Sequence, residues 1–290
     1  MNTIVITILS LSLIGSLAAI ILYFVAQKFK VIEDPRIDQV DEVLPGANCG
    51  GCGFPGCRGF AEACVNSEEL ADLFCPVGGN DCMSDVASVL GKDAVSKDPE
   101  VAVIRCSGSP EHRSQTNFYD GAVSCTVAHN LYAGDTGCQY GCFGCGDCVV
   151  VCDFDAIYMN EETKLPVVID DACTACNACV EECPRDIIEL RRKNKKDRKI
   201  FVSCVSMDKG GIAKKACSVA CIGCKACLKV CPHDAITVEN FLAYIDPVAC
   251  KLCRKCVVVC PTDSILEINF PARKIKVEKE NSAEEAVIKK

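Results

Sequence analysis

The chain has 290 residues, 27 cysteines and a formal net charge of −8 at neutral pH, with 6% aromatic residues and no tryptophan. At this length we expect two or three domains with small hydrophobic cores, so metal clusters should supply part of the stability. The acidic balance argues against nucleic acid as a partner, because phosphate backbones attract basic surfaces.

Residues 4–26 form a run of 23 residues without a charge, long enough to cross the hydrocarbon core of a bilayer. No basic segment precedes the run and no clear cleavage site follows it, so we interpret residues 1–30 as an uncleaved membrane anchor. Lys28 and Lys30 come directly after the run. By the positive-inside rule, the N-terminus faces outward and the rest of the chain lies in the cytoplasm, at the inner membrane. The run has no Asp, Glu, Lys, Arg or His, so an ion that crosses the membrane would need other subunits.

A charged segment at 31–43 predicts a linker, and a glycine-rich cysteine motif of the form C-x2-C-x4-C-x17-C-P follows it. Glycines let the backbone approach inorganic sulfide and aim N–H groups at it. A phosphate-binding loop is the alternative, but the motif lacks the Gly-Lys-Ser/Thr ending of such loops. We therefore predict a small iron–sulfur domain at 31–100, with helices at 58–65 and 83–90. The predicted ligands of its single [4Fe–4S] cluster are Cys49, Cys52, Cys57 and Cys75.

Two runs of the form C-x2-C-x2-C-x3-C begin at Cys142 and Cys173, which is the bacterial ferredoxin signature. Three thiolates spaced in this way wrap three corners of a cubane, and the fourth points away to ligate the neighbouring cluster. One predicted ligand set is Cys142, Cys145, Cys148 and Cys183. The other set is Cys152, Cys173, Cys176 and Cys179.

The same pattern occurs again 77 to 79 residues further along the chain, which indicates duplication of one structural unit. The repeated sets are Cys221, Cys224, Cys227 and Cys260, and Cys231, Cys250, Cys253 and Cys256. Short apolar runs predict strands at 101–105, 156–159, 165–170, 187–190, 200–203, 235–238, 242–246 and 264–268. We therefore predict an α+β fold with two tandem ferredoxin-like modules of the bacterial 2[4Fe–4S] type, at 101–190 and 191–270, and a charged tail at 271–290.

Seven cysteines lie outside these five sets, and we take structural thiols as their default role. They are Cys64, Cys82, Cys106, Cys125, Cys138, Cys204 and Cys217. Two alternatives assign these cysteines to clusters. Some of them could hold a sixth cluster, or Cys138 could replace Cys145 as a ligand. Disulfides are disfavoured by the odd cysteine count and the expected cytoplasmic side, and zinc by the triple x2 spacing. The basic segment at 191–199 is interpreted as a solvated linker, with a docking patch for an acidic electron carrier as the alternative.

The motifs predict electron transfer rather than conversion of a substrate. The sequence shows no nucleotide-binding fingerprint, nucleophile elbow or paired acid and base. Clusters held by four thiolates have no open coordination position, so they move one electron at a time. A membrane-anchored arm with five clusters is therefore expected to act as a wire.

The sequence combines the uncharged helix with the segments GANCGGCGFPGC, CPVGG and CQYGCFGCGDCVVVCDFDAI and with the ferredoxin pairs. Taken together, these features resemble the B subunit of the Rnf complex over nearly the whole chain. The second ferredoxin module resembles the longer members of that family. The resemblance implies a complex that passes electrons between soluble ferredoxin and NAD, coupled to Na+ or H+ movement, with other Rnf-type membrane subunits as partners. Members of the family usually carry an apolar residue in place of Cys145, which is why Cys138 is considered there.

On this interpretation the cluster of the first motif lies nearest the bilayer, and the C-terminal module is our hypothesis for entry of electrons from the carrier. The alternative is a polyferredoxin-like subunit of another membrane oxidoreductase, such as a hydrogenase, although the first motif is foreign to plain polyferredoxins. A metal-sensing or scaffolding protein would instead require clusters that do not cycle at low potential.

Overall fold

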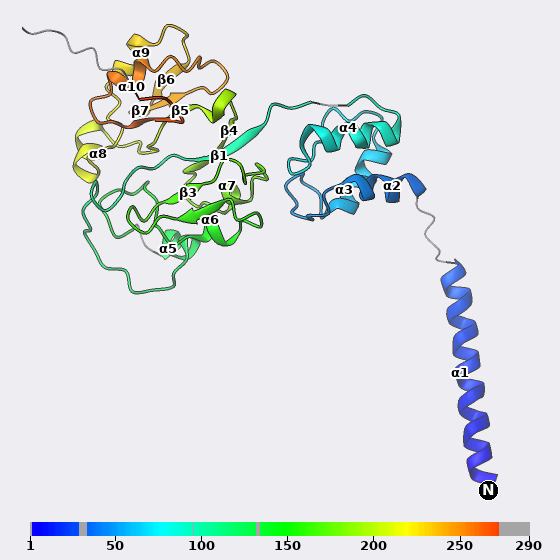
Figure 1. The fold of residues 1–290 in the computed structure, drawn as a ribbon. Helices are drawn as coiled ribbons and strands as arrows, with labels where there is room; N and C mark the ends of the chain where they lie inside the picture. The colour runs from blue at the N-terminus through cyan, green and yellow to red at the C-terminus, as the bar shows by residue number, and fades with distance from the viewer. Residues whose placement is uncertain (1, 29–33, 95, 132–133, 273–290) are drawn as a thin grey trace, which may run out of the picture. The chain divides into compact units, whose positions relative to one another are not determined.

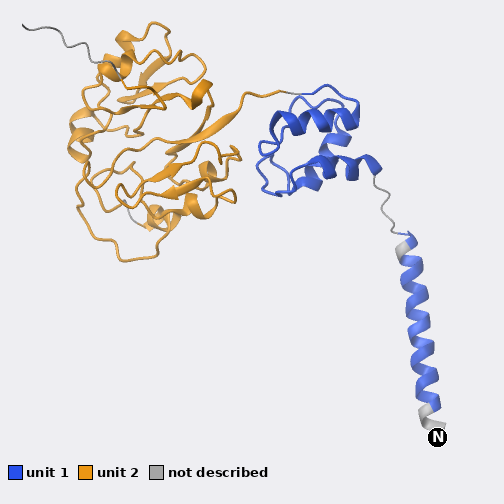
Figure 2. Cartoon of the chain, in the orientation of Figure 1, with its two compact units in different colours: residues 1–95 blue, residues 96–290 orange. Residues whose placement is uncertain are grey.

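The structure is a computed structural model that describes residues 2–28, 34–94, 96–131 and 134–272. The chain forms two compact units, Met1–Val95 and Ser96–Lys290 (Figure 2). Helices α1 to α4 belong to the first unit, and strands β1 to β8 belong with α5 to α10 to the second (Figure 1). This confirms the predicted α+β fold. Residues 29–33 around the expected linker and 273–290 of the predicted tail lie outside the described residues.

The predicted membrane segment is a single helix, α1 (Asn2–Lys28). Its segment Val5–Val25 has a mean hydropathy of 2.5 and is long and apolar enough to cross a membrane. Large side chains such as Leu11 and Leu13 are 70% and 72% exposed. A helix that is apolar on all sides needs an apolar environment, so α1 is suited to a bilayer.

The predicted linker is wrong for its second half, which forms helix α2 (Pro35–Val43). Asp34 caps this helix, because its Oδ1 accepts the Arg36 N–H at 2.9 Å, and proline is favoured in the first turn of a helix. Ile37 and Val40, three residues apart on one face, are buried in the core of the unit. The charged residues of α2 occupy its outer face. Their number led to the prediction of a linker, because the segment was judged by its composition.

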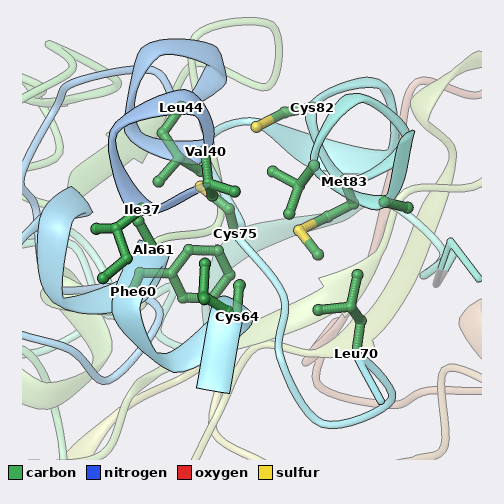
Figure 3. Packing of buried hydrophobic residues seen from close by; sticks show 13 residues of the cluster. Ile37, Val40, Leu44, Phe60, Ala61, Cys64, Leu70, Cys75, Cys82 and Met83 are labelled. Carbon is green, nitrogen blue, oxygen red and sulfur yellow. The ribbon is translucent and has the colours of Figure 1, made fainter. Parts of the chain in front are cut away.

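The two helices predicted beyond the first cysteine motif are confirmed as α3 (Cys57–Asn66) and α4 (Gly79–Leu90), and α4 ends at the left-handed Gly91. Their apolar faces meet α2 in the core shown in Figure 3. Phe60 and Met83 are 1% and 0% exposed there, and Cys64 is fully buried beside them. Cys64 is therefore a core residue, as the sequence predicted.

The second unit contains two copies of the same strand arrangement, each built from two antiparallel pairs. In the first copy β1 (Glu100–Ile104) pairs with β4 (Ile188–Arg192), and β2 (Ile157–Met159) pairs with β3 (Pro166–Val168). In the second copy β5 (Lys199–Val202) pairs with β8 (Ile265–Ile268), and β6 (Ile236–Glu239) pairs with β7 (Leu242–Ile245). The predicted strands are confirmed, and each module's first strand pairs with its last.

The helices of the second unit are short and lie mainly next to the cysteine loops (Figure 1). In the first module they are α5 (Cys125–Leu131), α6 (Asp147–Val150) and α7 (Ala178–Glu182). In the second module they are α8 (Gly210–Ala216), α9 (Ala226–Val230) and α10 (Lys255–Val258). A single 3₁₀ turn, η1 (Lys195–Asp197), lies between β4 and β5.

The interpretation of residues 191–199 as a solvated linker or docking patch is wrong at both ends. Arg191 belongs to β4 and is 3% exposed, and Lys199 belongs to β5 and is 4% exposed. Lys199 Nζ lies 2.5 Å from Asp170 Oδ1, and Arg191 pairs with Glu189. Buried charges persist when they are paired in this way, so the basic residues at the two ends of the segment are neutralised inside the fold.

Candidate metal centres

The four cysteines of the first motif line one cavity in the first unit, namely Cys49, Cys52, Cys57 and Cys75. The loop that carries them needs left-handed backbone at Gly50 and Gly53, with φ of 72° and 85°. Asn48 fastens this loop to the start of α3, because its Oδ1 accepts the Cys57 N–H at 2.8 Å. The loop and the first turn of α3 thus carry three of the thiols, and the segment between α3 and α4 brings Cys75 to the same cavity.

Cys82 supports this site without belonging to the set of four. Its thiol hydrogen-bonds Cys75 and also lies 3.5 Å from Val43 O, so its one proton serves either acceptor. The contact with Cys82 lowers the pKa of Cys75 and outweighs burial, and the Gly78 N–H donates to Cys75 Sγ at 3.3 Å. The same contact, with burial, raises the pKa of Cys82. Cys82 is therefore a protonated hydrogen-bond donor beside the cavity.

The four ferredoxin-type loops share one backbone conformation around their middle cysteine. The residues just before and just after it have positive φ in every loop, in the pairs Gly144 and Gly146, Ala175 and Asn177, Gly223 and Lys225, and Leu252 and Arg254. Such a conformation is uncommon for leucine, lysine or arginine and costs free energy, which points to a functional constraint. Alternating right- and left-handed residues turn successive N–H groups inward and form a nest for an anion. Each loop is thus shaped for a negatively charged group between its cysteines.

In the first module one cavity is lined by Cys125, Cys142, Cys148 and Cys183. Cys148 lies in α6, whereas Cys183 follows α7, so the predicted crossing of the fourth cysteine to the neighbouring set agrees with the geometry. Among the described residues that line this cavity, Cys125 takes the place that the motif assigns to Cys145. This candidate was missed from the sequence because Cys125 belongs to no motif.

Cys125 and Cys145 hydrogen-bond each other beside this cavity. Burial, followed by the charge and hydrogen bond of Cys125, raises the pKa of Cys145 to about 12. Asp147 Oδ2 holds the start of α5 in place by accepting the Cys125 N–H at 2.8 Å. The set is therefore Cys142, Cys148 and Cys183 with either Cys125 or Cys145, and the cavity favours Cys125.

The second set of the first module gathers around Cys179 in α7. Burial raises the pKa of Cys179 to about 12, and the neighbouring thiols of Cys173, Cys176 and Cys152 add to the effect. The Ala102 N–H in β1 points at Cys173 Sγ from 3.5 Å. The predicted set of Cys152, Cys173, Cys176 and Cys179 is thus brought together from both halves of the module.

The second module repeats both arrangements. One cavity is lined by Cys221, Cys224, Cys227 and Cys260. The other four thiols lie close enough to affect one another's pKa. Burial raises the pKa of Cys256 to about 12, and the charges of Cys250 and Cys253 add to this effect. Burial likewise raises the pKa of Cys250, and the charges of Cys253 and Cys231 contribute. Cys224 and Cys253 are exposed, whereas the other cysteines of the module are buried or partly buried.

Cys260 differs electrostatically from the other cysteines of these sets in the second module. Burial would raise the pKa of Cys260, but hydrogen bonds from the Ser264 hydroxyl and from the Thr262 and Ser264 N–H groups outweigh it and lower this pKa. Ser264 Oγ lies 3.2 Å from Cys260 Sγ and the serine is 2% exposed. The thiolate form of Cys260 is therefore stabilised inside the protein.

The remaining cysteines separate into two kinds. Cys64 and Cys82 lie in the core of the first unit. A further cavity in the second unit is lined by Cys106, Cys138, Cys204 and Cys217. Cys138 therefore lies at a different cavity from Cys142 and Cys148, which leaves Cys125 as the nearer alternative to Cys145.

The cavities suit a group larger than a single ion. In the described ranges, no three Cys, His, Asp or Glu side chains converge on the position of one metal ion. Each cavity presents several thiols, and the ferredoxin-type loops add backbone shaped to bind an anion, so the sites fit an iron–sulfur cubane with one thiolate at each iron.

Family models match the same three regions. An Fe-S cluster model covers residues 44–77, and models of a 4Fe-4S dicluster domain cover 138–190 and 220–264. These matches support [4Fe–4S] clusters in both ferredoxin-type modules.

Curated relatives extend the similarity over most of the chain. The chain is 43% identical to the B subunit of the Na(+)-translocating ferredoxin:NAD(+) oxidoreductase complex of Acetobacterium woodii, over 85% of this chain and 72% of the relative. It is 39% identical to the proton-translocating counterpart of Clostridium ljungdahlii, over 85% of each chain. It is 40% identical to the B subunit of the ion-translocating oxidoreductase complex of Methanosarcina acetivorans, over 80% of this chain and 86% of the relative. The chain therefore belongs to the family of B subunits of Rnf-type ion-translocating oxidoreductase complexes and is a membrane-associated electron-transfer subunit.

Proposed function

We propose that this chain is the cytoplasmic arm of its complex and carries electrons between soluble ferredoxin and the NAD-linked, ion-translocating membrane subunits. The relatives from Acetobacterium and Clostridium are named ferredoxin:NAD(+) oxidoreductases, which supports this pair of redox partners. Helix α1 would anchor the arm with its N-terminus outside, since Lys28 closes the apolar segment on the side of the cluster domains. The chain converts no substrate of its own.

The observation that carries the proposal is the repetition of complete four-thiol sets along one anchored chain. The proposed ligands of the first cluster are Cys49, Cys52, Cys57 and Cys75, and those of the first module are Cys142, Cys148 and Cys183 with Cys125 or Cys145, and Cys152, Cys173, Cys176 and Cys179. The proposed ligands in the second module are Cys221, Cys224, Cys227 and Cys260, and Cys231, Cys250, Cys253 and Cys256. Such clusters supply one-electron transfer when bound. The thiols, the inward N–H groups and burial hold them without an open position.

The coupled ion would move through other subunits. The segment Val5–Val25 contains no charged side chain, and ion pathways across membranes are built from such groups. The relatives are named for Na+ in one case and for protons in another. A protein that only transfers electrons serves either ion without change.

Electron entry through the C-terminal module follows from the exposure of its cysteines. Cys224 and Cys253 are exposed, whereas the equivalent cysteines of the first module, Cys145 and Cys176, are partly buried. The rate of electron transfer falls steeply with distance, so a docked carrier exchanges electrons fastest with a cluster at the surface. Entry at the second module therefore places the carrier where the ligands are most accessible.

The test of electron entry uses a matched pair of variants, Cys253→Ser and Cys176→Ser, which alter the same position in the two modules. Rapid mixing with reduced ferredoxin would follow reduction of the remaining clusters. We expect Cys253→Ser to slow this reduction strongly and Cys176→Ser to leave its fast phase intact. Equal rates in the two variants would contradict entry at the second module.

The test of the function itself begins with anaerobic purification of the complete complex and measurement of iron, acid-labile sulfide and zinc. We expect at least about twenty irons per chain with matching sulfide, and cluster reduction by ferredoxin that continues to NAD in the complex. Zinc in place of iron, or clusters that ferredoxin does not reduce, would overturn the proposed function.

A further inference from the structure

The four cysteines Cys106, Cys138, Cys204 and Cys217 come from both modules and line a single cavity. Cys106 and Cys204 follow the equivalent strands β1 and β5, and Cys138 and Cys217 each precede the first motif cysteine of their module by four residues. Cys138 and Cys217 are 9% and 7% exposed. Duplication has thus placed two equivalent thiols from each module against one another.

The walls of this cavity are fixed by hydrogen bonds between the modules. The Ser107 N–H donates to Ser203 O at 3.3 Å, and the two serine hydroxyls lie 2.6 Å apart. On another side the Ser218 N–H donates to His112 O at 2.9 Å. Arg105 spans the junction, because its guanidinium reaches Glu189 in β4 and Val202 O in β5. The four thiols are therefore held by two polypeptide segments that are ordered against each other.

Backbone donors at this cavity repeat those of the proposed cluster sites. The Cys142 N–H points at Cys106 Sγ from 3.5 Å, and the Ser206 N–H points at Cys204 Sγ from 3.4 Å. Comparable N–H groups face Cys75, Cys173 and Cys221 at 3.3 to 3.5 Å. Hydrogen bonds of this kind stabilise thiolate and cluster sulfur rather than a neutral thiol.

A buried cation supplies a second, independent indication. Arg113 is 8% exposed and lines the cavity, and no carboxylate among the described residues forms an ion pair with it. Its guanidinium lies against Gly141, where an added Cβ would be 2.9 Å from Arg113 Nη1 and 3.4 Å from Cys138 Sγ. An uncompensated buried charge is costly, so a guanidinium held beside four thiols calls for an anion in this space.

We propose that Cys106, Cys138, Cys204 and Cys217 hold a sixth [4Fe–4S] cluster that joins the two ferredoxin modules. Four thiolates around a cubane would give the site a net negative charge, which the positive charge of Arg113 would offset in part. One electron passes from a reduced cluster of one module to this cluster, so that the donor is oxidised by one electron and the sixth cluster is reduced by one. The sixth cluster thereby provides the connection between the exposed module and the module nearer the anchor in sequence.

The test compares the complete chain with the double variant Cys204→Ser/Cys217→Ser after anaerobic purification. We expect about twenty-four irons and matching sulfide in the parent chain and about four fewer in the double variant. The core variant Cys64→Ala, whose thiol faces no cavity of this kind, should keep the full number. About twenty irons in the parent chain, an unchanged count in the double variant, or one zinc that the double substitution removes would each overturn the proposal.

A second variant tests the site if the double variant loses several clusters through misfolding. Arg113→Met keeps the length of the side chain and removes its charge, so the site should still assemble. Loss of a nearby positive charge makes reduction harder, and we expect the midpoint potential of a single cluster to fall while the others keep theirs. Redox titration followed by electron paramagnetic resonance would show this. A set of potentials identical to that of the parent chain would refute the assignment of Arg113 and its thiols to one cluster.

Discussion

Ser264 gives the sharpest test of how this protein sets the potential of one cluster. Its hydroxyl lies 3.2 Å from Cys260 Sγ, the serine is 2% exposed, and the hydrogen bond lowers the pKa of Cys260 against the effect of burial. Reduction adds one negative charge to the cluster, so this bond is stronger in the reduced state. Ser264→Ala removes the donor and leaves the backbone hydrogen bonds in place.

The expected size follows from the energy of one hydrogen bond. A net difference of about 1 kcal/mol between the reduced and oxidised states is typical of a single donor. For transfer of one electron, a tenfold change in equilibrium corresponds to about 59 mV, so about 1 kcal/mol lowers the midpoint potential by about 40 mV. We expect this shift in one cluster of the second module.

Protein-film voltammetry or a redox titration of the anaerobic protein would measure the shift. Thr262→Val is the graded control, because Thr262 Oγ1 lies 3.9 Å from Cys260 Sγ and should contribute less. The first module has Ile187 at the position equivalent to Ser264, so its corresponding cluster already lacks this donor. An unchanged or raised potential in Ser264→Ala at full iron content would refute the reasoning.

Three further substitutions test packing and backbone. Phe60→Ala should cost about 3–5 kcal/mol in the first unit, since Phe60 is 1% exposed, and anaerobic proteolysis should cut that unit faster while sparing the second. The Gly223→Ala variant should lose about four irons, because the φ of Gly223 is 63° and an added Cβ would lie 2.6 Å from Phe241 O. The control variant Gly211→Ala should lose no iron, because an added Cβ at Gly211 meets no atom within 4 Å. Arg105→Met removes a buried guanidinium and should cost about 2–3 kcal/mol, seen by calorimetry as a fall of about 4–10 °C in the thermal midpoint of the second unit. Wild-type behaviour in any of these measurements would contradict the packing described for that residue.

The sequence predicted best those parts of the fold where spacing alone determines geometry. The helices beyond the first cysteine motif and the strands between the C-x2-C-x2-C loops recur where the pattern placed them. The spacing of cysteines or apolar residues every two or three positions is a local pattern, so it can be recognised without knowledge of the rest of the chain. The helix α2 was missed although Asp34, Pro35 and the pair Ile37 and Val40 are ordinary signals of a helix start and an apolar face.

The errors arose where a residue's role depends on distant partners. Lys199 looks like a linker residue until Asp170 is seen beside it, from a segment 29 residues away, and Arg191 until β4 is seen paired with β1. Cys125 belongs to no motif, and its proximity to Cys148 appears only once α5 and α6 are packed. Long-range contacts of this kind leave no period in the sequence.

The exposure of Cys224 and Cys253 has a consequence for survival in air. A ligand that a protein carrier can approach is also within reach of dioxygen, which takes electrons from reduced clusters and oxidises the sulfur that holds them. The C-terminal module is therefore the part of the chain that should decay first when the protein leaves anaerobic conditions. The equivalent cysteines of the first module, Cys145 and Cys176, are partly buried, and dioxygen should reach them more slowly.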